Sequence, residues 1–176
     1  ALEMLPVEWG YGALRHLGRL HKAARGGGAA RRNLTAVFAE RPAEWIERQV
    51  SAGLQAHYVS QLQVFLFPHI TRRSAREHLA LEGEDHLRAA LRAGRGAILV
   101  HGHYGPIQLP LHVLGLLGWP VMQLGYRTDE GLSAIGRRVA FGLRVRYEGA
   151  IKAPIVMTDQ YLRPLFDWLR ANRVLF

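Results

Sequence analysis

The chain has 176 residues, of which 49% are hydrophobic and 21% are charged, so it can form one domain with a hydrophobic core and is not a disordered polymer. It contains no cysteine, which excludes a disulfide-stapled scaffold and a cysteine-ligated zinc or iron–sulfur site. The net charge is +9 at pH 7, and nearly all the basic residues are Arg. This charge favours an anionic partner, and composition alone leaves nucleic acid, anionic lipid and phosphorylated small molecules open.

The first third of the chain is predicted to be helical. Apolar residues at helical spacing predict helices over residues 5–22, 29–38 and 44–67. Gly26 to Gly28 separate the first two helices, and Pro68 is expected to end the third. The residues that follow, 69–81, are predicted to be a polar connector.

The segment from Gly10 to Phe38 is basic and amphipathic. It contains six Lys or Arg residues and no Asp or Glu. A helix of this kind with Trp and Tyr can lie in a membrane interface, or its Leu stripe can dock it on the protein as an ordinary surface helix. The pattern leaves both interpretations open.

From residue 84 onwards the pattern predicts alternating helices and strands. Short apolar runs bounded by Gly or Pro are typical of strands buried on both faces of a parallel sheet. Helices are predicted over 84–93, 109–117, 131–143 and 160–171, and strands over 96–100, 120–124, 144–147 and 173–176. The sequence therefore predicts an α/β fold with a mostly parallel central sheet flanked by helices, after an α-helical N-terminal region.

The most informative segment is His101 to Gln108, directly after the first predicted strand. Ligands of open α/β sheets bind at the carboxyl ends of strands, Gly allows close approach to the backbone, and a His can act as a general base near neutral pH. Either His in this segment can also be a structural residue. No metal site is predicted, because His101 and His103 have no carboxylate cluster nearby, and no nucleotide-binding loop or serine-hydrolase motif is present.

Several motifs in register resemble one family, the bacterial lipid A biosynthesis acyltransferases. The run Gly94-Arg-Gly-Ala-Ile-Leu-Val-His-Gly-His-Tyr-Gly-Pro-Ile-Gln108 looks like its active-site segment, which carries a His-x-x-x-x-Asp/Glu box. Further similar elements are Arg32-Asn33-Leu34 with Phe38, Glu82-Gly83 with His86-Leu87, Gly118-Trp-Pro-Val121, and Tyr126-Arg127.

The resemblance implies a glycerolipid acyltransferase-like fold and an O-acyltransferase. Such an enzyme moves a fatty acyl chain from an acyl carrier protein or coenzyme A thioester to a hydroxyl of a membrane glycolipid of the lipid A type, without a cofactor. It implies that His103 is the catalytic general base and that Gln108 stands in the acid position of the box. It also implies substrate-binding roles for Arg127, which suits a phosphate, and for His101, Tyr104 and Gly105, which line the site. Nucleic acid is not an expected partner, since the Arg residues are scattered and no nucleic-acid-binding module is present.

Gln108 departs from the family box. An amide can accept an N–H bond, but it brings no charge to orient and stabilise an imidazolium, and an acid-to-amide change in a serine-protease triad costs roughly 10⁴ in rate. Three explanations stay open: a natural variant with another orienting acid, an engineered trapping substitution, or a chain that binds lipid with little or no turnover.

The resemblance also implies an organisation and a location. Residues 1–80 are expected to be a helical, membrane-associating region and residues 81–176 the α/β acyltransferase core. The family continues beyond the strand at Phe176, so the chain is expected to be incomplete at its C-terminus. The expected location is peripheral, at the cytoplasmic face of the bacterial inner membrane, with the anionic membrane surface as a partner.

Overall fold

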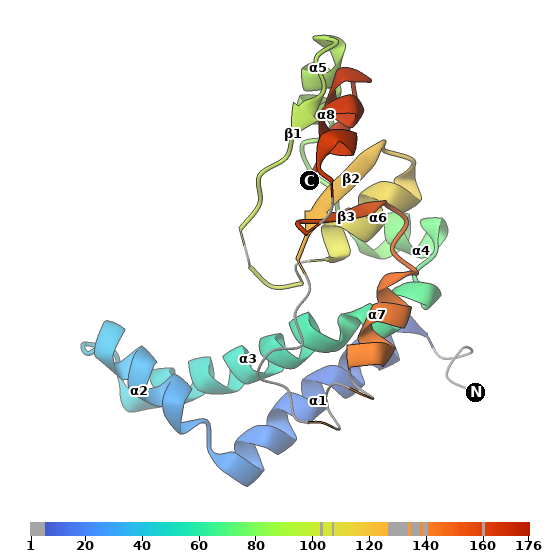
Figure 1. The fold of residues 1–176 in the computed structure, drawn as a ribbon. Helices are drawn as coiled ribbons and strands as arrows, with labels where there is room; N and C mark the ends of the chain where they lie inside the picture. Colours follow the sequence, from blue (N-terminus) through green and yellow to red (C-terminus); the bar gives the residue numbers. More distant parts are fainter. Residues whose placement is uncertain are drawn as a thin grey trace. The chain divides into compact units, whose positions relative to one another are not determined.

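The computed structural model describes residues 6–102, 104–106, 108–126, 134, 138, 141–159 and 161–176 and, for His78, the backbone alone. The chain forms two compact units (Figure 1). The helical unit comprises Ala1–Leu66 with Tyr104–Ile107, and the α/β unit comprises Phe67–His103 with Gln108–Phe176.

The helical unit follows the predicted order of helices. They are α1 (Val7–Arg25), α2 (Gly28–Val37) and α3 (Ala43–Leu62), and a 3₁₀ helix, η2 (Gln63–His69), follows directly. Gly26 and Gly27 separate α1 from α2 with φ of 73° and 65°, a left-handed conformation that Gly adopts without strain. The α-helix predicted to reach residue 67 ends instead at Leu62. Pro68 lies inside η2, because its ring and missing N–H do not fit a continuing α-helix.

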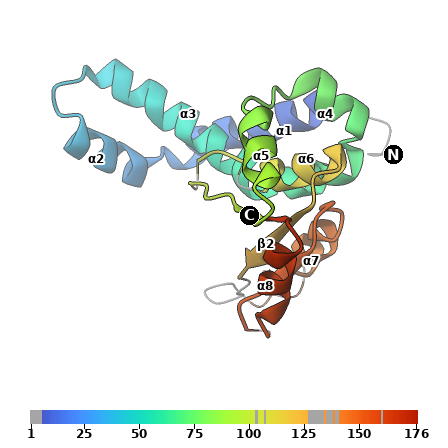
Figure 2. The same cartoon turned by 90° about the horizontal axis from the view of Figure 1, so that it is seen from above.

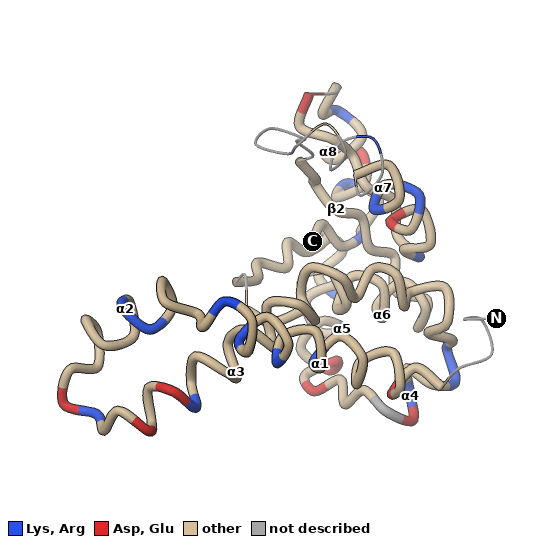
Figure 3. Tube along the Cα trace, turned by 90° about the horizontal axis from the view of Figure 1, so that it is seen from below, with Lys and Arg blue, Asp and Glu red and all other residues tan. Residues whose placement is uncertain are grey.

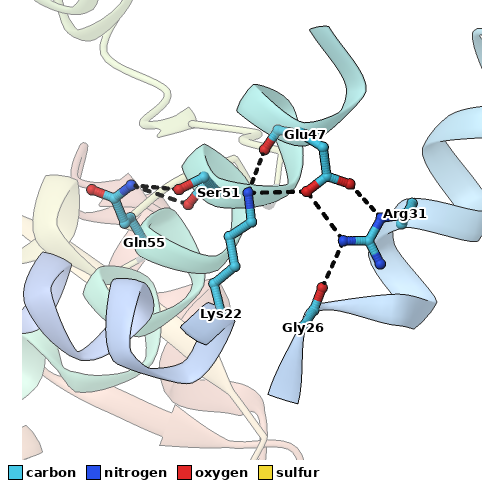
Figure 4. A network of polar contacts seen from close by, with 6 residues as sticks. All are labelled: Lys22, Gly26, Arg31, Glu47, Ser51 and Gln55. Atoms are coloured by element: carbon cyan, nitrogen blue, oxygen red, sulfur yellow. Dashed lines mark hydrogen bonds and ion pairs between the residues drawn. The ribbon is translucent and has the colours of Figure 1, made fainter. Parts of the chain in front are cut away.

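Close packing and one ion cluster join the three helices. A Cβ added to Gly18 on α1 would lie 2.7 Å from the backbone nitrogen of Gln55 on α3, so only Gly allows this approach. The Glu47 carboxylate of α3 accepts hydrogen bonds from Arg31 of α2 and pairs with Nζ of Lys22 of α1 at 3.2 Å (Figure 4). The hydrogen bond from Arg31 is the main cause that lowers the pKa of Glu47 to about 2. Glu47 therefore links α1, α2 and α3 in its charged form.

The α/β unit contains a four-stranded sheet in which every strand pair is parallel. The strands are β1 (Ala97–Ile98), β2 (Val121–Gly125), β3 (Ile155–Met157) and β4 (Val174–Leu175), in the order β1-β4-β2-β3. In the register of the sheet, Val174 lies between Ala97 and Val121, and Gln123 lies beside Ile155. The predicted parallel α/β fold is confirmed.

Helices flank this sheet. They are α4 (Arg72–His78), α5 (Glu84–Arg92), α6 (Leu109–Leu117), α7 (Gly142–Glu148) and α8 (Arg163–Arg170). Figure 2 shows α5 and α6 on one side of β2 and α7 and α8 on the other. Leu111 of α6, Val121 of β2 and Val174 of β4 are almost fully buried and form the centre of the core.

Two predictions for this unit are wrong. The segment predicted as a polar connector contains α4, which begins with a capping box between Thr71 and Ser74. The strand predicted over 144–147 is part of α7, where Arg144 and Glu148 form an ion pair one turn apart, and the third strand is Ile155–Met157. Most of the helix predicted over 131–143 lies outside the described residues, as does Gln160 at the start of another predicted helix.

Among the described residues, no helix is both long enough and apolar enough to span a membrane.

Candidate functional site

The loop after β1 begins at the carboxyl edge of the sheet. The backbone N–H of Leu99 donates to the carbonyl of Leu175 at 2.8 Å, which extends the pairing with β4 by one residue. The imidazole of His101 then stacks on Phe176, with ring centroids 4.3 Å apart and planes 24° apart. Its Nδ1 lies 3.2 Å from the carbonyl oxygen of Gly102. His101 is thus held against the residue that follows β4.

Two of the predicted site residues, His103 and Arg127, lie outside the described residues. Tyr104 and Gly105 belong to the helical unit. The side chain of Tyr104 is 92% exposed. Gly105 has φ of 61°, and its carbonyl accepts a hydrogen bond from Oγ of Ser60 on α3 at 2.8 Å. The backbone of this segment is therefore fixed to α3, while the Tyr104 side chain faces solvent.

Gln108 is held by a buried carboxylate of the α/β unit. It is the N-cap residue of α6, yet its side chain caps no backbone N–H of that helix. Instead Nε2 of Gln108 donates to Oε1 of Glu148, the last residue of α7, at 3.1 Å. Nε of Arg144 lies 2.9 Å from the same oxygen. Glu148 is 5% exposed, so its carboxylate lies almost fully buried beside Gln108.

Sequence reasoning did not single out Glu148. The pattern before it predicts a strand over 144–147, and 40 positions separate Glu148 from Gln108. The available signal was the spacing of Arg144 and Glu148, because opposite charges four residues apart are neighbours on a helix and lie far apart on a strand.

A second polar side chain lies deeper, one turn after Gln108 on α6. His112 is 1% exposed and stacks on Phe67 with ring centroids 4.7 Å apart. Neither ring nitrogen has a partner that meets hydrogen-bond geometry. Burial lowers the pKa of His112, and the nearby backbone of Ile70 and Phe67 opposes this effect only in part. His112 is therefore a neutral core residue at pH 7.

Within the part of the chain that the structure describes, no group of three or more His, Asp or Glu residues could hold a metal ion.

An all-parallel sheet with a His- and Gly-rich loop at its carboxyl edge defines an α/β protein of the class that binds ligands at strand ends. The family model "Bacterial lipid A biosynthesis acyltransferase" matches residues 1–174, and the chain belongs to this family. The family is the one that the sequence motifs resemble. A comparison with curated proteins gives no match.

Membership gives the general activity of the chain. The family carries out acyl transfer in lipid A biosynthesis, which requires an acyl donor and a lipid acceptor and indicates association with a membrane.

Proposed function

We propose that this chain transfers a fatty acyl chain from an acyl carrier protein or coenzyme A thioester to a hydroxyl of a membrane glycolipid of the lipid A type. The observation that carries the proposal is the family match over residues 1–174, within which His103 occupies the histidine position of the family box. No cofactor takes part.

In the proposed step, His103 removes the proton of the acceptor hydroxyl. The hydroxyl oxygen attacks the thioester carbonyl carbon, a C–O bond forms and the C–S bond breaks. The thiolate that leaves then takes the proton from the imidazolium. A general base contributes roughly 10²–10⁴ in rate, so loss of the imidazole should reduce turnover by at least that order.

The contact between Gln108 and Glu148 supports the first explanation for the departure at Gln108, another orienting acid. Because Nε2 of Gln108 donates to Glu148, its amide oxygen is the atom with which Gln108 accepts an N–H bond. In this proposal that bond orients the His103 ring. Glu148 then supplies, one hydrogen bond further away, the negative charge that the box acid would bring.

Substrate binding is proposed for Arg127, whose guanidinium suits a phosphate of donor or acceptor, and for His101, Tyr104 and Gly105 as lining residues.

Peripheral membrane attachment is proposed through α1, on the cytoplasmic face of the inner membrane. Trp9, Leu17 and Leu20 are exposed large apolar residues of this helix. At 3.6 residues per turn they fall within roughly 80° of one another around its axis. Beyond Glu8, every charged residue of α1 and α2 is Lys or Arg, as the blue positions in Figure 3 show. An apolar stripe with basic residues around it is typical of a helix that lies in an anionic membrane interface.

The test is acyl transfer from a mass-tagged acyl thioester to a membrane glycolipid, followed by mass spectrometry of the lipid. His103→Ala should reduce transfer to background, whereas His57→Ala, at an exposed His of α3, should leave it unchanged. Equal turnover in the wild type and His103→Ala would refute the assigned base.

A second function, lipid binding with little turnover, is motivated by Gln108 itself. It would be supported if the wild type bound the glycolipid but transferred no acyl group from either donor.

A further inference from the structure

A cleft of about 760 Å³ lies in the α/β unit. Residues of α4 and α5, the end of α6 and the segment before β2 line it. Trp119 and Pro120 of this lining directly precede β2, so the cleft opens at the amino-terminal end of that strand. The residues directly after β1, where the family motif begins, leave the sheet at its opposite, carboxyl edge.

Three guanidinium groups converge on this cleft from two helices. Arg72 and Arg76 come from α4, and Arg88 comes from α5. Arg88 pairs with Glu84 at 3.0 Å. Among the described residues, neither Arg72 nor Arg76 pairs with a carboxylate, and both side chains are exposed. The cleft therefore keeps an excess of positive charge at its mouth.

Arg72 and Arg88 each make one further contact with the protein. Nη2 of Arg72 lies 3.5 Å from the carbonyl oxygen of Leu117, at the C-terminal end of α6. The guanidinium of Arg88 lies over the ring of Trp119, 4.8 Å from its centroid. Arginines that are fixed before binding lose less side-chain entropy when they bind an anion.

Apart from Glu84, which pairs with Arg88, and the Trp119 ring, the remaining side chains that line the cleft are aliphatic. They form a wall that includes Leu79 and Leu81 after α4, Leu91 of α5 and Leu117 of α6, together with Pro120. Leu81 is 37% exposed, so apolar surface is left open beside the arginines. Such a wall suits a hydrocarbon chain.

We propose that this cleft binds an anionic phospholipid, with the phosphate ester on Arg72 and Arg76 and an acyl chain along the leucine wall. The planar guanidinium forks form paired hydrogen bonds to phosphate oxygens, and burial of methylene groups on the leucines adds affinity. The site goes beyond the proposed function, since it holds whether or not the chain transfers an acyl group.

The test is isothermal titration calorimetry of the full chain with dihexanoyl phosphatidic acid below its micelle concentration. The matched soluble probes are dihexanoyl phosphatidylcholine, glycerol 3-phosphate and inorganic phosphate. Phosphatidic acid should bind about tenfold or more tightly than each of the others, because only it offers both a net anionic phosphate ester and acyl chains. Equal binding of inorganic phosphate would overturn the lipid part of the proposal, and equal binding of phosphatidylcholine would overturn the role of charge.

The variants separate the cleft from general electrostatics. The double variant Arg72→Gln/Arg76→Gln should weaken phosphatidic acid binding by about tenfold or more, since it removes two charge-assisted contacts. The control Arg73→Gln/Arg92→Gln removes the same amount of charge from α4 and α5 at positions outside the lining, and it should change affinity by less than about twofold.

A third variant tests the leucine wall. Leu81→Gln should weaken binding of phosphatidic acid but not of glycerol 3-phosphate. Circular dichroism checks that each variant is folded. No binding of phosphatidic acid by the wild type, or equal loss in the cleft and control variants, would overturn the proposal.

Discussion

The contact between Gln108 and Glu148 predicts that Gln108→Glu, which restores the family acid, destabilises the α/β unit unless Glu148 is changed as well. In Gln108→Glu a carboxylate takes the place of an amide whose nitrogen lies 3.1 Å from Oε1 of Glu148. The hydrogen bond is lost, and two like charges face each other beside a side chain that is almost fully buried. Arg144, a cation that pairs with Glu148, is half exposed, so solvent weakens its attraction to the two carboxylates.

The expected destabilisation has an upper limit set by protonation. An ordinary Glu has a pKa near 4.3, so protonation of one carboxyl at pH 7 costs about 4 kcal/mol. If the repulsion between the two carboxylates were larger than this cost, one of them would take up a proton, and the repulsion would disappear. Loss of the amide-to-carboxylate hydrogen bond costs about 1.5–3 kcal/mol by itself. We therefore expect Gln108→Glu to lower the free energy of unfolding by about 2–4 kcal/mol at pH 7.

The same reasoning fixes the sign of the pH dependence. In the variant the shared site raises the pKa of one carboxyl above its unfolded value, so the native state holds a proton that the unfolded chain releases. Its stability is highest below pH 4.3 and falls as pH rises through the raised pKa. At pH 5 the protonation cost is only about 1 kcal/mol, so the destabilisation should shrink accordingly.

The assay is urea unfolding at pH 7 and pH 5, with Glu148→Gln and the double variant Gln108→Glu/Glu148→Gln as controls. The double variant exchanges the two groups and restores an amide–carboxylate pair, so its stability should return to within about 1 kcal/mol of the wild type. The reasoning is refuted if Gln108→Glu is as stable as the wild type at pH 7, or if the double variant loses the sum of the two single losses.

Three other predictions concern packing and charge. Gly115→Ala should lower the unfolding free energy by about 1–3 kcal/mol or more in urea, because the added Cβ would lie 1.9 Å from the carbonyl oxygen of Lys152. Gly142→Ala, whose Cβ meets nothing within 4 Å, should stay near the wild type. The lowered pKa of His112 means that the unfolded chain binds more protons below pH 6.5, so acidification from pH 7 to 5 should destabilise the wild type more than His112→Leu. Equal pH dependence of these two proteins would contradict the buried neutral imidazole. Glu47→Gln should lower the melting temperature of the helices, measured by circular dichroism, at pH 7 but not near pH 2. The reason is that the Glu47 carboxylate stabilises the fold only while it is charged. A loss of the same size at both pH values would rule out the ion cluster as its cause.

Helices with strong local signals could be predicted closely from the sequence. The prediction over 109–117 matches α6, and that over 84–93 matches α5 within one residue. In both cases an apolar stripe is followed by Gly, and Gly94 and Gly118 have φ of 73° and 91°, which suits a helix end.

The two wrong predictions have different causes. For α4 the local signal existed, since Thr71 and Ser74 form a capping box, but the Arg-rich composition suggested a connector. For α7, basic and apolar residues alternate over Arg144-Val-Arg-Tyr147, which is typical of a strand. The ion pair between Arg144 and Glu148, four residues apart, favours the helix that the structure shows.

For the candidate site, the sequence predicts which residues take part but not the contacts between residues far apart in the chain. The sequence places Gln108 in the family box, but its contact with Glu148 is a tertiary contact that no local pattern encodes.

Ion pairs neutralise part of the positive charge of the α/β unit locally. Several arginines of the α/β unit pair with an acid one helical turn away, which neutralises them locally while adding little stability. These pairs are Arg73–Glu77, Arg88–Glu84, Arg144–Glu148 and Arg163–Asp167. Arg72 and Arg76 at the mouth of the cleft stand apart from them.

In the helical unit, the stretch from Gly10 to Phe38 has no acid of its own, and Glu47 neutralises only part of its charge through Lys22 and Arg31. The net charge of +9 therefore predicts two anion-attracting surfaces, one in each unit. Because their basic residues lie on different elements, substitutions at Arg72 and Arg76 should weaken the binding of single phosphatidic acid molecules about tenfold or more, yet preserve the attraction of α1 to anionic vesicles.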